Sequence, residues 1–363
     1  MSSTALTHVT DPADWVGSQW PSLDAISTTV SAAQITELDA LCARLEARGL
    51  AFDATDRHDF PFETLAPLLA TMRHELADGR GFFLLRGLPL GDWSKARARL
   101  ATWGLGTWLG THVCQTVDGQ RLTDVIDTSA TETTPRQFKT SQELRLHTDP
   151  ASDLIGLACL QPSKSGGNSV LTSAIAVHNA MLAQEPELLQ ALYDGYLWHR
   201  YGEGRPEDGP ITREPVPIFA RRDGRLSCRY VRAPIAAGHR DAGVPLTPTQ
   251  LAALDRFDQL ASSPQLRLTL RMAPGDLLMV NNLAVLHART QFEDHPEPER
   301  RRHILRLWLE GWPGFRPVPP QLNFFNGGRC GIQPAPNQRA EYDMAKLYSD
   351  RASGGVANLG VHD

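Results

Sequence analysis

The chain has 363 residues, of which 41% are hydrophobic and 21% charged, and its formal net charge is -5. This is the composition of a globular protein with a buried core, and the length fits one elaborated domain as well as two domains. The negative charge gives no electrostatic reason to expect a nucleic-acid partner. No apolar run reaches the roughly 18 residues of a membrane span, and the first ten residues lack the pattern of a signal peptide. We therefore expect a cytoplasmic protein.

The cysteines are odd in number, scattered, and without a CxxC pair. This pattern is typical of reduced, mostly buried thiols rather than of a disulfide framework. The five are Cys42, Cys114, Cys159, Cys228 and Cys330.

The first third of the chain is predicted to be mainly helical. Residues 1–30 are polar and irregular, and we expect this N-terminal segment to lie over the surface. Apolar residues spaced by three and four predict helices over residues 32–49, 62–78 and 93–103. Between them, the apolar run at 82–86 predicts a short strand, ended by a glycine and a proline.

After about residue 110 the pattern changes to short strands separated by turn residues. Two helices interrupt them, one over 174–192 with a break at Pro186, the other over 248–261. This favours a mixed α+β, mainly β fold, with one main domain over 31–312 and a C-terminal extension over 313–363. The predicted strands cover 124–127, 143–147, 154–160, 169–172, 197–201, 217–220, 226–231, 266–272, 277–281 and 303–310.

Two segments are expected to be long loops. Residues 128–140 are rich in Thr and Ser, and residues 202–215 mix glycines and prolines with charges. Long loops in a compact domain often cover a binding site, although an ordinary surface excursion is an equal alternative for each.

A candidate metal site begins at Glu143-Leu-Arg-Leu-His-Thr-Asp149, whose alternation predicts a strand. Side chains two apart on a strand share a face, so His147 and Asp149 can reach one metal ion. His287 follows a later apolar strand and is the candidate third ligand. Two imidazoles and one carboxylate leave open positions on the metal, as in Fe(II) oxygenases.

Two other motifs are discounted. His239-Arg-Asp241 repeats the His-x-Asp spacing, but the glycines and proline around it favour a surface turn. Gly104-Leu-Gly-Thr-Trp-Leu-Gly110 resembles a dinucleotide loop, yet it follows a predicted helix rather than a strand. Several other histidines and tryptophans are interpreted as packing or surface residues, namely His178, His199, His303, Trp103, Trp108, Trp198 and Trp308.

Basic residues follow His287. Arg302 and Arg306 share a face if residues 303–310 form a strand. A guanidinium can hold a carboxylate by a two-pronged contact, and the hydroxyl of Ser169 is a candidate second donor. The alternative for Arg302 is a surface charge in the run 299–303.

Together these motifs give a specific pattern. The chain resembles the taurine dioxygenase and clavaminate synthase-like family of Fe(II)/2-oxoglutarate-dependent oxygenases over about residues 80–312. The motifs, in the family's order, are His-Thr-Asp at 147–149, Gly-Gly-x-Ser at 166–169, Gly-Asp at 275–276, His-Ala-Arg-Thr at 287–290 and Arg-x-x-x-Arg at 302–306.

The resemblance implies a double-stranded β-helix, a distorted jelly roll, with flanking N-terminal and inserted helices. It also implies that Fe(II) is bound by the catalytic residues His147, Asp149 and His287. O2 would be the second co-substrate beside 2-oxoglutarate.

The co-substrate residues are also implied by the resemblance. Arg302 would bind the distal carboxylate of 2-oxoglutarate, assisted by Ser169. The family often has Thr at this position, and Thr172 remains a rival. Arg306 would bind either the co-substrate or a carboxylate of the substrate.

The implied reaction is oxidation of an unactivated C–H bond, most often hydroxylation, with release of succinate and CO2. Desaturation, epoxidation or cyclisation are alternatives, as are a metal enzyme that does not use 2-oxoglutarate and a non-catalytic binding protein. The expected substrate is a small polar compound such as an amino acid or natural-product intermediate. No membrane partner is expected, and homo-oligomer formation is left open.

The substrate pocket is expected to be formed by residues 128–143 and 202–215, with residues 323–326 of the C-terminal extension near its mouth. The candidate substrate contacts are Thr140, Gln142, Arg213 and Arg306.

Overall fold

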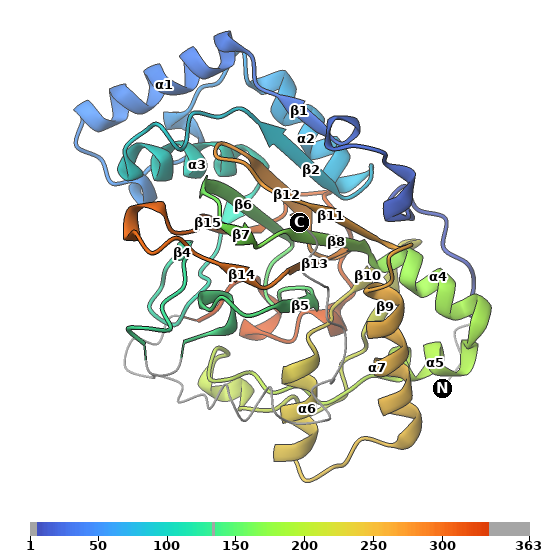
Figure 1. Ribbon diagram of the computed structural model, residues 1–363. Coiled ribbons are helices and arrows are strands. Elements are labelled where there is room, and N and C mark those ends of the chain that lie inside the picture. Colours follow the sequence, from blue (N-terminus) through green and yellow to red (C-terminus); the bar gives the residue numbers. More distant parts are fainter. Residues whose placement is uncertain (1–5, 133–134, 334–363) are drawn as a thin grey trace.

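The computed structural model describes residues 6–132 and 135–333. Its centre consists of β-sheets, and helices cover them on opposite sides (Figure 1). This confirms the mixed α+β class.

The larger sheet has seven strands. All its pairings are antiparallel except the one between β1 and β2. The strand order is β1 (Ser27–Thr29), β2 (Phe82–Arg86), β12 (Leu277–Asn281), β6 (Leu154–Gln161), β15 (His303–Glu310) and β3 (Thr111–His112), with β4 (Leu122–Val125) also paired to β15.

The smaller sheet has four antiparallel strands in the order β11 (Arg267–Leu270), β8 (Ser169–Ser173), β13 (Val285–Arg289) and β5 (Leu144–His147). Two short pairs accompany it, β9 (Phe219–Arg222) with β10 (Arg225–Cys228) and β7 (Ser165–Gly166) with β14 (Phe292–Glu293). The outer strand β5 and its neighbour β13 carry the two histidines of the predicted metal site.

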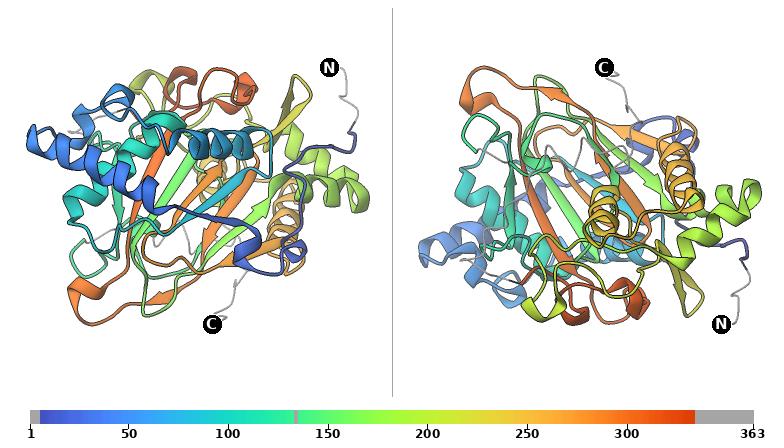
Figure 2. Two further views of the ribbon diagram at one scale, coloured as in Figure 1. Left: turned by 90° about the horizontal axis from the view of Figure 1, so that it is seen from above. Right: turned by 90° about the horizontal axis from the view of Figure 1, so that it is seen from below.

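Helices α1 (Ala32–Ala47), α2 (Ala66–Ala77) and α3 (Lys95–Leu109) cover one face of the larger sheet (Figures 1 and 2). Alternate residues of β15, such as Leu305 and Leu307, pack against them in one apolar cluster. The other residues of the strand, including Ile304, therefore face the second sheet, because side chains alternate along a strand.

A second apolar cluster joins the inner faces of the two sheets. It contains Leu278 and Ile304 from the larger sheet and Leu171 and Val285 from the smaller one. The outer side of the smaller sheet is covered by helices, which include α4 (Ala174–Gln184), α5 (Pro186–Asp194) and α7 (Pro248–Ala261). Helix α6 (Arg232–Asp241) lies beside α7 in Figure 1.

Several predicted elements match the structure closely. The strands at 82–86, 277–281 and 303–310 and the helix at 248–261 have the expected bounds, and Pro186 separates α4 from α5. The dinucleotide-like glycines lie inside α3 and its end, so that motif is not a phosphate loop. The five cysteines are free, and none of the described helices is long and apolar enough to cross a membrane.

Three predictions of local structure were wrong. Residues 197–201 form no strand, since this segment makes only isolated bridges such as His199 with Ile211. The N-terminal segment does not simply lie over the surface. Trp15 is buried in the core, and β1 pairs with β2.

The third error concerns His239, which is in α6 rather than in a surface turn. Its Nε2 accepts a hydrogen bond from the backbone of Leu197, and its Nδ1 donates to the carbonyl of Val244. Both ring nitrogens are therefore occupied, and discounting this motif as a metal site is supported.

Candidate active site

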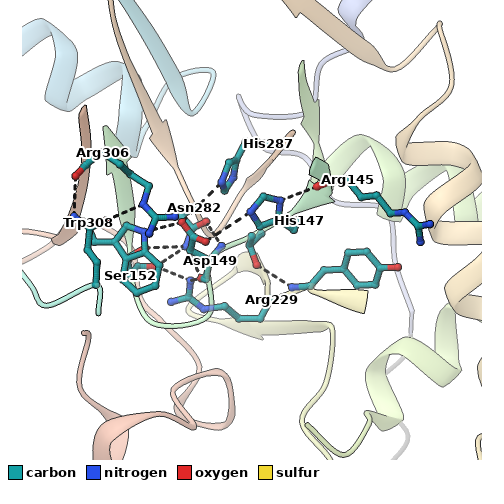
Figure 3. Close-up of polar contacts among 12 residues, drawn as sticks. Arg145, His147, Asp149, Ser152, Arg229, Asn282, His287, Arg306 and Trp308 are labelled. Atoms are coloured by element: carbon teal, nitrogen blue, oxygen red, sulfur yellow. Dashed lines mark hydrogen bonds and ion pairs between the residues drawn. The ribbon is translucent and has the colours of Figure 1, made fainter. Parts of the chain in front are cut away.

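The three predicted ligands converge between the two sheets (Figure 3). His147 at the end of β5 pairs directly with His287 on β13, and their ring centroids are 4.2 Å apart. Asp149 lies two residues beyond β5, with its carboxylate oxygens 3.7 Å from Nε2 of His147 and 3.8 Å from Nε2 of His287. Candidate ligand atoms of all three lie within 4.8 Å of one another. This donor set fits one face of an Fe(II) octahedron.

Both imidazoles are suited to bind a cation. Nδ1 of His147 donates to the carbonyl of Arg145 at 2.7 Å, which leaves Nε2 with a free lone pair. Burial lowers the pKa of His147, and burial together with His147 lowers the pKa of His287 to about 3. Both rings are therefore neutral near pH 7, the form that coordinates metals.

Asp149 is held ionised. Burial by itself would raise the pKa of this carboxyl, but Arg306 foremost, with a hydrogen bond from Trp308, lowers it overall. Nε1 of Trp308 donates to Oδ2 of Asp149 at 2.7 Å and fixes the orientation of the carboxylate.

The backbone of the ligand turn is fixed by two side chains that directly follow other strands, Asn282 after β12 and Arg229 after β10. Asn282 accepts from the Asp149 amide at 2.8 Å and donates to the carbonyls of Asp149 and Ser152, each at 2.7 Å. Nη1 of Arg229 donates to the same two carbonyls. The turn is thus ordered by the protein itself, without needing a metal to define it.

Arg302 directly precedes β15 and, because side chains alternate along the extended chain, faces inward with Ile304. It is 7% exposed, so the alternative of a surface charge is wrong. Its Nη1 has no hydrogen-bond partner, and within residues 6–132 and 135–333 no carboxylate lies within 4.0 Å of its guanidinium. Burial lowers its pKa to about 10, against the opposing influence of Cys159 and Asp294. A buried cation of this kind fits an anionic ligand.

The register of β8 separates the two candidate hydroxyls. Ser169 pairs with Arg289 and Leu171 pairs with His287, so Ser169 shares the inner face with the metal ligand. Thr172 lies on the opposite face, and its hydroxyl donates to the carbonyl of Ala261 at 2.8 Å. The structure brings Ser169 to the site and directs Thr172 away from it.

Arg306 lies closer to the metal ligands. Its Nε donates to Oε1 of Gln115 at 2.8 Å, and Gln115 donates back to the carbonyl of Arg306. The guanidinium lies over the ring of Phe138 at 4.3 Å and interacts electrostatically with Asp149. Gln115 and Phe138 therefore fix a buried cation beside the carboxylate ligand.

The other candidate substrate contacts are not brought to the ligands. Gln142 and Arg213 are exposed, and Thr140 is half-buried with its hydroxyl donating to the carbonyl of Gln137. These polar residues were selected because they are in the loops, and sequence position does not give the direction of a loop side chain.

The loops themselves meet as expected. Arg136 in the first loop forms an ion pair with Glu203 in the second at 2.6 Å. In the C-terminal extension, Phe325 packs in a cluster with Trp308, and the amide of Gly331 donates to the carbonyl of Ala151. Residues 334–363 of the predicted extension lie outside the described residues.

The model of the Taurine catabolism dioxygenase TauD, TfdA family matches residues 45–308. The chain belongs to this family. It is 32% identical over 291 residues to FR-33289 synthase of Streptomyces rubellomurinus. The aligned region covers 78% of this chain and 85% of that protein.

Solved oxygenases share the fold at low identity. An asparagine oxygenase in complex with Fe(II), 3-hydroxyasparagine and succinate has a TM-score of 0.61 and 20% identity, covering 78% of this chain and 93% of its own. The oxygenase OrfP, solved with Fe and α-ketoglutaric acid, has a TM-score of 0.60 and 14% identity, covering 84% and 99%. The family member described here is thus a non-haem iron oxygenase that uses Fe(II), 2-oxoglutarate and O2.

Proposed function

We propose that this oxygenase hydroxylates a C–H bond of a small polar substrate that carries an acidic group, and that Arg306 binds that group. Its two facing sheets would form the double-stranded β-helix implied by the sequence motifs. The observation that carries the proposal is the position of Arg306, a buried cation that faces the ligand carboxylate of Asp149 and is held by Gln115 and Phe138.

The roles of the two arginines follow from their partners. Arg302 has a buried, unpartnered Nη1 beyond the metal ligands and suits the distal carboxylate of 2-oxoglutarate, with Ser169 as a second donor on the neighbouring strand. Arg306 is four residues further along the same face of β15. Two separate cations on one strand can bind two separate anions, the co-substrate and the substrate.

The iron site would be formed by His147, Asp149 and His287. When bound there, iron with 2-oxoglutarate and O2 supplies the oxidising power for an unactivated C–H bond, with succinate and CO2 as co-products. The chain's own contribution is to keep the imidazoles neutral, the carboxylate ionised and the substrate oriented. The asparagine oxygenase, with its bound hydroxylated amino acid and succinate, supports hydroxylation of a small compound as the expected outcome.

The test is a turnover screen with amino acids and other small acids, each paired with its neutral amide. Succinate release and a substrate mass gain of one oxygen atom are measured together. We expect acids to be oxidised and their amides to react at least tenfold more slowly, because a buried guanidinium left without its anion is costly.

The variant Arg306→Gln should raise the KM for the acid more than that for 2-oxoglutarate. Equal turnover of acids and amides would contradict the role of Arg306. Loss of two hydrogens instead of gain of oxygen would replace hydroxylation by desaturation.

A further inference from the structure

Arg289, two residues after a metal ligand, has no role in the proposed chemistry, yet it is 5% exposed and faces the inner side of β13. Its Nη2 donates to the backbone carbonyls of Thr140, at 2.7 Å, and Gln142, and its Nη1 donates to that of Phe138 at 3.4 Å. One guanidinium thus binds three carbonyls of the loop that borders the site.

Among the described residues, Arg289 forms no direct ion pair with an acid, although Asp127 and Asp294 act on it electrostatically from further away. In the part of the chain that the structure describes, no carboxylate lies within 4.0 Å of its guanidinium, and Nε has no hydrogen-bond partner. Arg302 lies nearby. The ring of Phe292 is 4.7 Å from the guanidinium carbon of Arg289 and 5.3 Å from that of Arg302. The two cations therefore lie against the same ring, and their like charges repel each other because a buried site screens them poorly.

The loop that Arg289 binds, residues 135–142, also lies beside Arg306, the arginine proposed to bind the substrate. Phe138, whose carbonyl accepts from Arg289, places its ring against the guanidinium of Arg306. In the same loop, Arg136 reaches Glu203 across the site. The position of residues 135–142 therefore depends on Arg289, whose positive charge is repelled by that of Arg302.

We propose that Arg289 is a positioning residue that couples binding of 2-oxoglutarate at Arg302 to the order of residues 135–142. A carboxylate bound at Arg302 offsets the repulsion between the two guanidiniums, and Arg289 then holds the three carbonyls more firmly. The loop consequently places Phe138 against Arg306 and completes the substrate subsite after the co-substrate has bound. This inference rests on the proposed role of Arg302.

Hydrogen–deuterium exchange of the Fe(II)-loaded protein tests the coupling under anaerobic conditions, with and without saturating 2-oxoglutarate. In the wild type, we expect amides of residues 135–142 to exchange about tenfold more slowly when 2-oxoglutarate is bound. In Arg289→Gln the same amides should exchange fast in both states, although 2-oxoglutarate still binds within about tenfold of the wild-type affinity.

Arg271→Gln is the matched control, because Arg271 also donates to backbone carbonyls, those of Ser163 and Lys164, but on the exposed side of the fold. It should leave the 2-oxoglutarate response of residues 135–142 unchanged. If Arg289→Gln does not fold, Arg289→Lys retains the charge without the planar fork and should show a reduced response.

Wild-type exchange that is the same with and without bound 2-oxoglutarate would overturn the coupling, as would a full response in Arg289→Gln. The 2-oxoglutarate affinity of a second variant distinguishes failure of the proposed function from failure of the coupling. If Arg302→Gln leaves 2-oxoglutarate affinity unchanged, the co-substrate site is misplaced. If affinity depends on Arg302 but the loop does not respond, the coupling alone is wrong.

Discussion

Two parts of the site are held by different kinds of interaction. One is the ligand face, formed by His147, Asp149 and His287, and the other is the mouth, formed by the loops 128–143 and 202–215. His147 and His287 are fixed by direct strand pairing, and Asn282 and Arg229 bind the backbone of Asp149 from two further segments. The mouth depends on side-chain contacts between loops, chiefly the ion pair of Arg136 with Glu203. The face is thus held by backbone pairing and buried hydrogen bonds, whereas the two loops of the mouth meet through a partly exposed ion pair. Changes in the face should therefore abolish all chemistry, and changes in the mouth should alter substrate use.

The largest effect is expected from Asp149→Ala. It removes the carboxylate ligand and the acceptor of the Trp308 hydrogen bond. Iron binding in stoichiometric amounts and 2-oxoglutarate turnover should both be lost, with a fall in rate of about 10³-fold or more, because the metal carries the oxidation. Metal analysis and succinate release measure the two effects.

The control for Asp149→Ala is Asp241→Ala, which alters the second His-x-Asp motif. It should retain iron and turnover. Full iron binding by Asp149→Ala, or loss of iron in Asp241→Ala, would show that the ligand face has been misassigned.

Arg302→Gln tests the binding of 2-oxoglutarate at the boundary between the ligand face and the mouth. Loss of a two-pronged, charge-assisted contact worth about 2–3 kcal/mol should raise the concentration of 2-oxoglutarate for half-saturation by about 30- to 160-fold. Iron affinity should change far less. Arg300→Ala is the control, because Arg300 is an exposed member of the same basic run. A parallel loss of iron and 2-oxoglutarate affinity would mean that Arg302 supports the fold rather than the co-substrate.

The ligand face was predictable because its signals are local. On a strand, residues two apart share a face, so His147 and Asp149 could be assigned together, and the same alternation placed Arg302 and Arg306 on one side of β15. The identical spacing at His239 and Asp241 is in a helix, where residues two apart point in different directions. The surrounding motifs, rather than the His-x-Asp pattern, separated the two.

The supporting contacts were not predictable, since they join residues far apart in the chain. Gln115 binds Arg306 across 191 positions, and Asn282 binds Asp149 across 133. Trp308 was interpreted as packing, although its position two residues after Arg306 on a strand could have indicated an inward-facing side chain. No local periodicity reveals such partners. For the same reason, Gln142 and Arg213 were chosen as substrate contacts but are exposed.

Trp308→Phe tests whether the ligand face needs this missed residue. The variant retains the aromatic packing with Phe325 and Ile155 but removes the hydrogen bond to Asp149. Loss of an outer-shell partner typically weakens metal affinity by 10- to 100-fold, so iron affinity should fall by about tenfold with the fold intact. Titration with iron under anaerobic conditions measures it, and Trp312→Phe, outside the site, is the control. Unchanged affinity would assign Trp308 to packing alone.

The smallest effect is expected at the mouth. The side chains of Arg136 and Glu203 are 36% and 10% exposed, so solvent screens their attraction, and an ion pair of this kind contributes about 1 kcal/mol at most. Glu203→Arg should therefore raise the substrate KM by roughly fivefold and leave iron binding and the half-saturating 2-oxoglutarate concentration unchanged. The double variant Arg136→Glu with Glu203→Arg restores an ion pair of reversed sign and should recover most of the loss if bridging the loops is the function of the pair. No recovery of the KM would mean that Glu203 acts through its own charge near Arg306, where its carboxylate repels an anionic substrate. The mouth would then select substrates by their charge as well as close over them.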